Sequence, residues 1–221
     1  LKRSSPLGAA IGPASLALRL AMGVLTVIFL WISVILGTVL GIAYGCTSGP
    51  IKLIPAFQRH KPMAFGFSNV FGPFLGCPGT PLRIFIGIGE VLAGWGLIIG
   101  LWGDALGFLG KDLGDLAKAL IVVAGCGLLT LGCIAAFMHK YIHKAPGINL
   151  PLAIVSAIFL LIRIFINGPE TWGHQMLCTW LSVLVLLGAI VTVIVNKLQG
   201  KHENTVAEAN AQMQQMLQEV G

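Results

Sequence analysis

Two ionisable side chains, Glu90 and Arg163, stand inside long apolar stretches of the sequence. A carboxylate within such a stretch is costly to bury, and where one occurs it commonly carries protons, binds a polar ligand or forms an ion pair. Glu90 follows Arg83 by about two helical turns, which places it about 10 Å along a helix that rises 1.5 Å per residue. Glu90 is therefore the first candidate for a functional site. Alternatively, it is a buried anchor that is protonated or bonded to a neighbouring helix.

Arg163 is poorly placed to pair with Glu90. Its helix begins at the same face of the molecule, so that Arg163 lies about 22 Å from this face and Glu90 only about 10 Å. We expect Arg163 to extend outward to the opposite membrane interface. His139, Lys140 and His143 are closer to Glu90 in depth and are its expected partners.

The histidines are candidate ligands of a haem or a chlorophyll. His139 ends one apolar stretch and His174 precedes another at the opposite face, so the two cannot bind one haem between them. Either could hold a single chlorophyll, although a surface histidine is the more usual explanation, and carotenoid or lipid could bind as well. The other histidines match no metal-site spacing and no Cys-x-x-Cys pair occurs, so no metal site is predicted.

No catalytic constellation is found. The sequence contains no Ser-His-Asp grouping, no P-loop and no dinucleotide-binding fingerprint, which favours a non-enzymatic function. Cys46 and Cys77 bracket a long loop and could form a disulfide, but in a reducing compartment they would be free thiols.

The elements that position these residues are membrane-spanning helices. Charged residues make up 10% of the chain and hydrophobic residues 56%, whereas a soluble domain has about 25% charged residues. A span needs about 20 apolar residues. Five stretches qualify or nearly qualify, and they are too apolar for a membrane barrel: residues 20–44, 84–102, 116–138, 148–166 and 175–196. The sequence therefore predicts an all-α, polytopic transmembrane bundle of about five spans (20–196), with an N-terminal segment (1–19) and a polar tail (197–221).

Residues 45–82 form the expected irregular loop. They contain six prolines, which prevent a continuous helix, and five phenylalanines, which are unusual in a solvated linker. The loop is predicted to lie in the membrane interface, as a lid on its own bundle or against a partner.

Regularly spaced glycines indicate where helices approach closely. Gly37, Gly41 and Gly45 recur every four residues in the first span, and Gly96 and Gly100 do so in the second. Because lipid does not drive helices together by the hydrophobic effect, small residues at contacts are needed. These faces pack either within the chain or against a neighbouring subunit.

Charge distribution indicates topology rather than a nucleic-acid partner, because the net charge of +6 is concentrated at helix ends. By the positive-inside rule the C-terminus lies on the stromal, matrix or cytoplasmic side. The start Leu1-Lys2-Arg3-Ser4-Ser5, with no acidic residue before Glu90, would suit the end of an organellar transit peptide, although an artificial start explains it equally well.

The polar tail carries a stripe of apolar residues at helical spacing: Val206, Met213, Met216, Leu217 and Val220. The stripe fits a helix on the membrane surface or docked to another subunit, and disorder is the third option.

The stretch Arg83-Ile-Phe-Ile-Gly-Ile-Gly-Glu-Val-Leu-Ala-Gly-Trp-Gly-Leu-Ile-Ile-Gly resembles the second span of the DoxX-like family, in which a Glu opens a Gly-rich helix. The ends of the third span, Ala135-Ala-Phe-Met-His-Lys, and of the fourth, Asn167-Gly-Pro-Glu, are similar to that family as well. The resemblance covers about residues 16–170 and implies a four-helix membrane bundle, to which the fifth span and the tail are additions. Some members are described as small subunits of terminal quinol oxidases, and the role of others is unsettled.

Two functions remain. The first is a non-catalytic accessory subunit of an energy-transducing membrane complex, surrounded by other membrane-protein subunits and lipid. A photosystem in the thylakoid is favoured, because histidines and aromatic residues lie at edges that pigments can reach; a respiratory complex in the mitochondrial inner membrane is the alternative. The second is a free-standing DoxX-like protein that handles a quinone, a proton or another small ligand around Glu90.

Overall fold

The computed structural model describes residues 13–107, 110–143, 147–167 and 203–220, together with 176–177, 180–185, 187–188, 190–191 and 194. Within these ranges, four helices are long and apolar enough to cross a membrane: Ala17–Leu53, Gly79–Leu106, Leu116–Lys140 and Asn149–Asn167. The described chain is all-helical, which confirms the predicted polytopic helix bundle.

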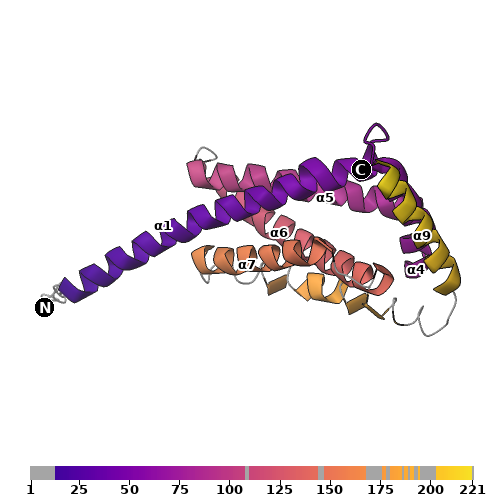
Figure 1. Cartoon of the computed structure of the whole chain (residues 1–221). Helices are drawn as coiled ribbons and strands as arrows, with labels where there is room; N and C mark the ends of the chain where they lie inside the picture. Colours follow the sequence, from indigo (N-terminus) through magenta and orange to yellow (C-terminus); the bar gives the residue numbers. More distant parts are fainter. Residues whose placement is uncertain are drawn as a thin grey trace, which may run out of the picture.

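From α1 to α7 the helices follow one another with few residues between them (Figure 1). The first span comprises α1 (Pro13–Gly41), the π-helical turn η1 (Ile42–Ser48) and α2 (Gly49–Leu53). Three short elements come next: α3 (His60–Gly66), η2 (Phe67–Phe71, also π-helical) and α4 (Gly72–Leu75). The long helices α5 (Gly79–Leu106), α6 (Gly110–His143) and α7 (Asn149–Asn167) complete the bundle, and α9 (Glu203–Val220) forms the tail.

Residues 45–82, expected to be an irregular loop, are largely helical. The first span continues to Leu53 instead of ending at residue 44, and the non-helical breaks are confined to residues 54–59 and 76–78. The prolines explain this, because Pro50, Pro62, Pro73 and Pro81 all lie in the first turn of a helix, where no backbone N–H is needed. They begin helices here rather than prevent them.

The expected fifth span, residues 175–196, lies partly outside the described residues. Those of its residues that the structure describes are helical. The remainder of this span stays a prediction.

The core lies between α1, α5, α6 and α7. Its centre is formed by Leu40, Leu97, Leu101, Ile121 and Phe159, none of which is exposed. This apolar layer separates the two ends of the bundle. We call the end that carries α2, α3 and α4 the Lys52 end.

Glycines allow α1 and α5 to touch through their backbones. A Cβ atom on Gly94 would lie 2.5 Å from the backbone nitrogen of Gly45 and 2.7 Å from the carbonyl oxygen of Gly41. The predicted positions Gly37 and Gly100 also face packed neighbours in this chain. At Gly96 the nearest atoms belong to the Leu120 side chain, at ordinary contact distance. All these glycines therefore face contacts inside the chain.

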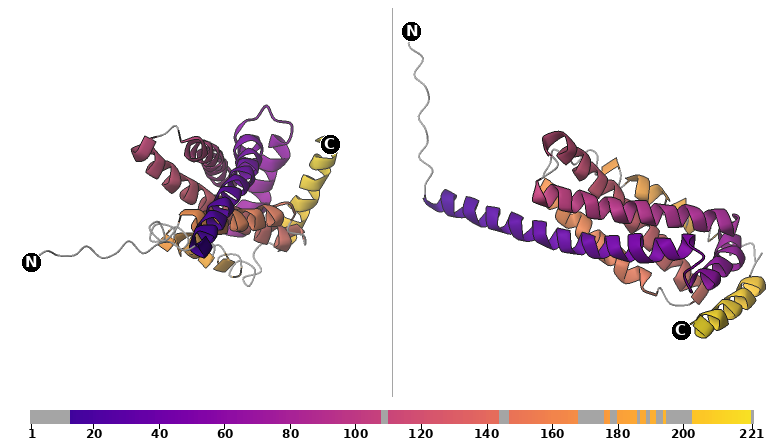
Figure 2. Two further views of the ribbon diagram at one scale, coloured as in Figure 1. Left: turned by 90° about the vertical axis from the view of Figure 1, so that its left-hand side faces the viewer. Right: turned by 90° about the horizontal axis from the view of Figure 1, so that it is seen from above.

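The two ends of the described chain occupy different surroundings. The N-terminal half of α1 projects beyond the other helices (Figures 1 and 2), and Leu18, Leu20, Val24 and Val27 on it are more than half exposed. In contrast, α9 lies across the Lys52 end, where it packs against α3, η2 and α6. The tail is therefore a docked helix rather than a disordered segment.

Candidate functional site

A cavity of about 350 Å³ lies at the Lys52 end of the bundle. Its volume is at the lower end of the range for small-molecule sites, roughly 300–1,000 Å³. Most of its wall is apolar and comes from α3, η2, α5, α6 and α9, with three methionines and two phenylalanines: Met63, Phe67, Phe71, Leu82, Ile86, Leu131, Ile134, Met138, Met213 and Leu217. Such a wall fits the flexible or flat apolar body of a ligand.

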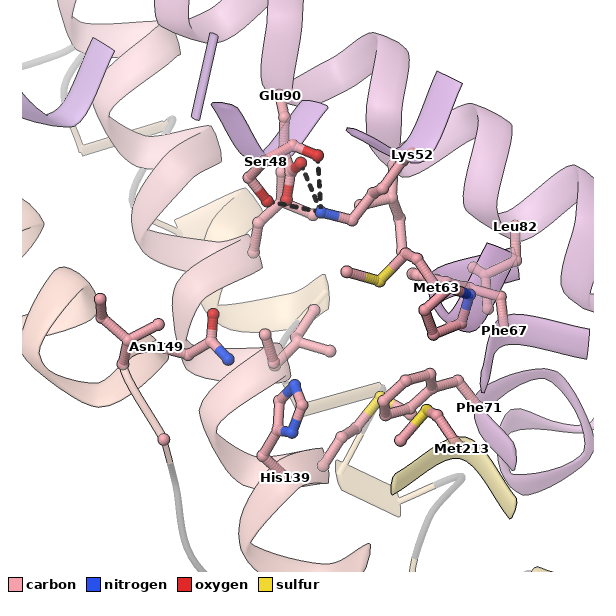
Figure 3. A pocket seen from close by; sticks show the side chains of 18 of the residues that line it. Ser48, Lys52, Met63, Phe67, Phe71, Leu82, Glu90, His139, Asn149 and Met213 are labelled. Carbon is pink, nitrogen blue, oxygen red and sulfur yellow. Dashed lines mark hydrogen bonds and ion pairs between the residues drawn. The ribbon is translucent and has the colours of Figure 1, made fainter. Parts of the chain in front are cut away.

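A buried ion pair forms one side of this cavity (Figure 3). The ammonium nitrogen of Lys52 lies 2.7 Å from Oε2 of Glu90, and the side chains are only 8% and 6% exposed. Lys52 also donates to Oγ of Ser48 at 2.6 Å and to the Ser48 carbonyl oxygen at 3.3 Å. Glu90 thus forms its ion pair with a cation of the first span, and not with the expected His139, Lys140 or His143.

The sequence positions Lys52 through the π-helical turn η1. Within it the helix hydrogen bonds run over five residues, as in the bond from the Gly49 N–H to the Tyr44 carbonyl. The wider turn carries the helix through Pro50 without a break, and Lys52 lies one turn after Ser48 on the same face. Close packing of Gly49 and Gly87 brings this helix against α5, so that Lys52 meets Glu90.

Arg83 and His60 hold the end of α2 in place. The guanidinium of Arg83 donates to the backbone carbonyl of Lys52 and lies 3.2 Å from Nε2 of His60. Nδ1 of His60 lies 2.9 Å from the carbonyl oxygen of Ile51. The tautomer with a proton on Nδ1 satisfies both contacts, because Nε2 then accepts from Arg83. These bonds fix the backbone from which the Lys52 side chain extends.

Two further polar side chains complete the cavity. His139 on α6 and Asn149 at the start of α7 both line it (Figure 3). The His139 ring packs edge-on against Phe71, with 5.5 Å between ring centroids. His139, proposed from sequence as a pigment ligand, is therefore part of a cavity wall. The other candidate, His174, lies outside the described residues.

Arg163 belongs to a second buried ion pair at the opposite end of the bundle. Its guanidinium lies 2.6 Å from Oδ2 of Asp104 and 3.5 Å from Oγ of Ser33, and the residue is 0% exposed. The expectation that Arg163 extends to the interface is therefore wrong. A carboxylate just beyond the predicted end of the second span neutralises it inside the protein.

The cysteines do not form the disulfide considered from sequence. Cys46 and Cys77 are free thiols in the structure. In the part of the chain that the structure describes, no group of three His, Cys, Asp or Glu side chains lies close enough to hold a metal ion.

Sequence reasoning identified Glu90 but missed Lys52 and Ser48. The sequence did contain a sign that Ser48 and Lys52 share a helix face: they are four residues apart. The facing helix also carries glycines that allow close approach. This sign was hidden by the assignment of both residues to a loop.

No family model, curated protein or solved structure matches this chain significantly.

Proposed function

We propose that this membrane protein binds one small amphipathic ligand in the cavity at the Lys52 end. The observation that carries the proposal is the ion pair of Lys52 and Glu90 at the side of an otherwise apolar cavity. Burying two charges costs several kcal/mol that apolar side chains would not, so such pairs are weak evidence for stability alone. A cavity with apolar walls and a few convergent polar groups is the usual form of a small-molecule site.

The ion pair and the apolar wall would bind different parts of the ligand. The ligand's apolar body would lie among Met63, Phe71 and Met213, with its head group toward Glu90. Proton transfer through the whole bundle is less well supported, because the apolar layer around Leu97 separates Glu90 from Arg163. This function corresponds to the second of the two predicted from sequence, and a DoxX-like identity remains part of the proposal.

The test is saturable binding of tritiated retinol to the purified protein in mild detergent, measured by scintillation proximity. Retinol serves as a probe with a ring, an apolar chain and one polar head. Ala135 lines the cavity on α6, so Ala135→Phe should fill part of the cavity and weaken binding at least about tenfold. Ala119→Phe places the same side chain on the exposed face of α6 and should leave binding unchanged. Equal binding by both variants would contradict the proposed site.

A second proposal is that the chain is an accessory subunit of an energy-transducing complex. The first span has 37 residues, and its length of about 55 Å exceeds the roughly 30 Å of a bilayer's hydrocarbon core. Its surplus lies in the exposed apolar half of α1, which a neighbouring membrane protein would cover. The thylakoid photosystem is the favoured complex and the mitochondrial inner membrane the alternative, with the C-terminus on the stromal or matrix side.

Native purification from source membranes in mild detergent tests this second proposal. Mass spectrometry of the band that contains the chain would identify its partners, and an absorption spectrum would identify chlorophyll or carotenoid. Migration with a photosystem or respiratory complex is the expected result. Migration as a single chain in its detergent micelle would contradict a subunit role and leave the ligand-binding proposal standing.

A further inference from the structure

We infer that the cavity selects an uncharged ligand whose head group is a hydroxyl, such as an isoprenoid or sterol-like alcohol, and rejects the corresponding carboxylate. This inference rests on the proposed ligand-binding function and names the chemical class of the ligand. It follows from three features of the cavity: its balance of charge, the donors of Lys52 and the acceptors of Glu90.

The buried ion pair in the cavity wall has no net charge left to offer a ligand. Among the described residues of its wall, the ionisable side chains are Lys52, Glu90 and His139. Lys52 and Glu90 are in direct contact at 2.7 Å and neutralise each other. A ligand carboxylate would bring a second anion next to Glu90 without a second cation, and burial of an unpaired charge costs several kcal/mol.

The guanidinium of Arg83 lies near this pair but outside the cavity wall. It is directed to the carbonyl oxygen of Lys52 and to the ring of His60. It stabilises the backbone on which Lys52 stands. Because Arg83 lies outside the wall, a ligand in the cavity does not contact its guanidinium.

The remaining hydrogen-bonding capacity of Lys52 and Glu90 distinguishes a ligand that donates a hydrogen bond from one that only accepts. An ammonium group has three protons, and Lys52 has three acceptors within the protein: Oε2 of Glu90, Oγ of Ser48 and the Ser48 carbonyl oxygen. A ligand that only accepts hydrogen bonds therefore finds no spare donor on Lys52. A carboxylate has about four lone-pair positions, so Glu90 can still accept a bond from a ligand hydroxyl. Hydrogen bonds to charged groups are worth about 1.5–3 kcal/mol.

Three probes that share one apolar skeleton test the inference on the intact protein. Retinol has a hydroxyl donor, retinyl methyl ether has the oxygen without the donor, and retinoate carries a negative charge. We expect retinol to bind at least about tenfold more tightly than the ether, because only retinol can donate to Glu90, as the strength of a charged hydrogen bond implies. Retinoate should bind at least as weakly as the ether.

A charge variant gives a result that a merely structural role of Glu90 would not produce. Glu90→Gln leaves the ammonium of Lys52 without its anion, so retinoate should become the preferred probe and retinol should lose its advantage. Glu208→Gln makes the same change at an exposed position of α9 and should keep the wild-type order. The three-probe comparison on the wild-type protein needs no variant, so it decides the question even if Glu90→Gln does not fold.

The outcomes separate the inference from the function on which it rests. Tight retinol binding with weak binding of the other two probes supports it. Retinoate binding as tightly as retinol, or the ether doing so, overturns the hydroxyl selectivity while the cavity remains a ligand site. Absence of saturable binding by all three probes overturns the proposed function itself, and this inference with it.

Discussion

Replacing Gly94 by alanine tests how the fold brings the two halves of the candidate site together. The new Cβ atom would lie 2.5 Å from the nitrogen and 2.6 Å from the Cα of Gly45. Carbon atoms prefer contacts of about 3.5–4.0 Å, and the atoms in the way belong to backbone that cannot rotate aside. The first span and α5 must therefore move apart by about 1 Å.

The magnitude follows from two opposing terms. Overpacking of this kind costs about 1–3 kcal/mol, whereas alanine is favoured over glycine within a helix by about 1 kcal/mol. Gly89 on the same helix provides the matched control, because a Cβ atom there would meet nothing within 4 Å. Gly89→Ala gains the helix term without the clash. The two variants should therefore differ by the overpacking term alone, about 1–3 kcal/mol in the free energy of unfolding.

The assay is unfolding in mixed micelles of increasing SDS content, followed by far-UV circular dichroism. Gly89→Ala should unfold at an SDS content equal to or above that of the wild type, and Gly94→Ala well below it. Retinol binding should weaken in Gly94→Ala alone, since Glu90 lies one turn from Gly94 and would move away from Lys52. If the two variants unfold together, the backbone contact between the first span and α5 is not as close as described.

Three further predictions use the same protein. Lys52→Met leaves the Glu90 carboxylate buried without its cation and should cost about 3–5 kcal/mol in the unfolding assay, most of which a second change, Glu90→Gln, should restore. Tyr44→Phe should raise the free energy of unfolding by about 1 kcal/mol, because the Tyr44 hydroxyl is buried without a hydrogen-bond partner among the described residues; a loss of stability would show that it has one. Burial raises the pKa of the Cys77 thiol above its ordinary value of 9.0. In a variant with only this cysteine, maleimide labelling should therefore rise with the thiolate fraction beyond pH 9.0, and a plateau at lower pH would contradict the assignment.

The spans were predictable from sequence because the length of an apolar run is a property of the chain alone. Their ends were less so. Residues 45–82 were predicted to be an irregular loop because of their prolines, whereas a π-helical turn precedes Pro50 and Pro50 lies at the start of the next helical segment. That one error moved Lys52 into a loop. The partner of Glu90 was therefore invisible before the fold was known.

Depth along a helix and facing direction are separate quantities, and sequence supplies mainly the first. The comparison of depths correctly excluded Arg163 as the partner of Glu90. It did not reveal that Asp104, just past the predicted end of the second span, turns inward to meet Arg163. Similarly, glycines spaced by four indicated close packing, but only the assembled bundle shows that Gly94 rather than Gly96 makes the backbone contact with Gly45.

The position of α9 in the chain has a consequence for when the cavity closes. Among the described residues, all other parts of the cavity wall, from Ser48 on the first span to Asn149 on α7, precede Glu203 in the sequence. Because the ribosome makes the chain from its N-terminus, Met213 and Leu217 are the last wall residues to be synthesised. In a chain that inserts before α9 docks, the cavity is an open groove. A ligand present in the bilayer at that stage meets this groove before α9 covers it, so a bound molecule can be enclosed as part of folding.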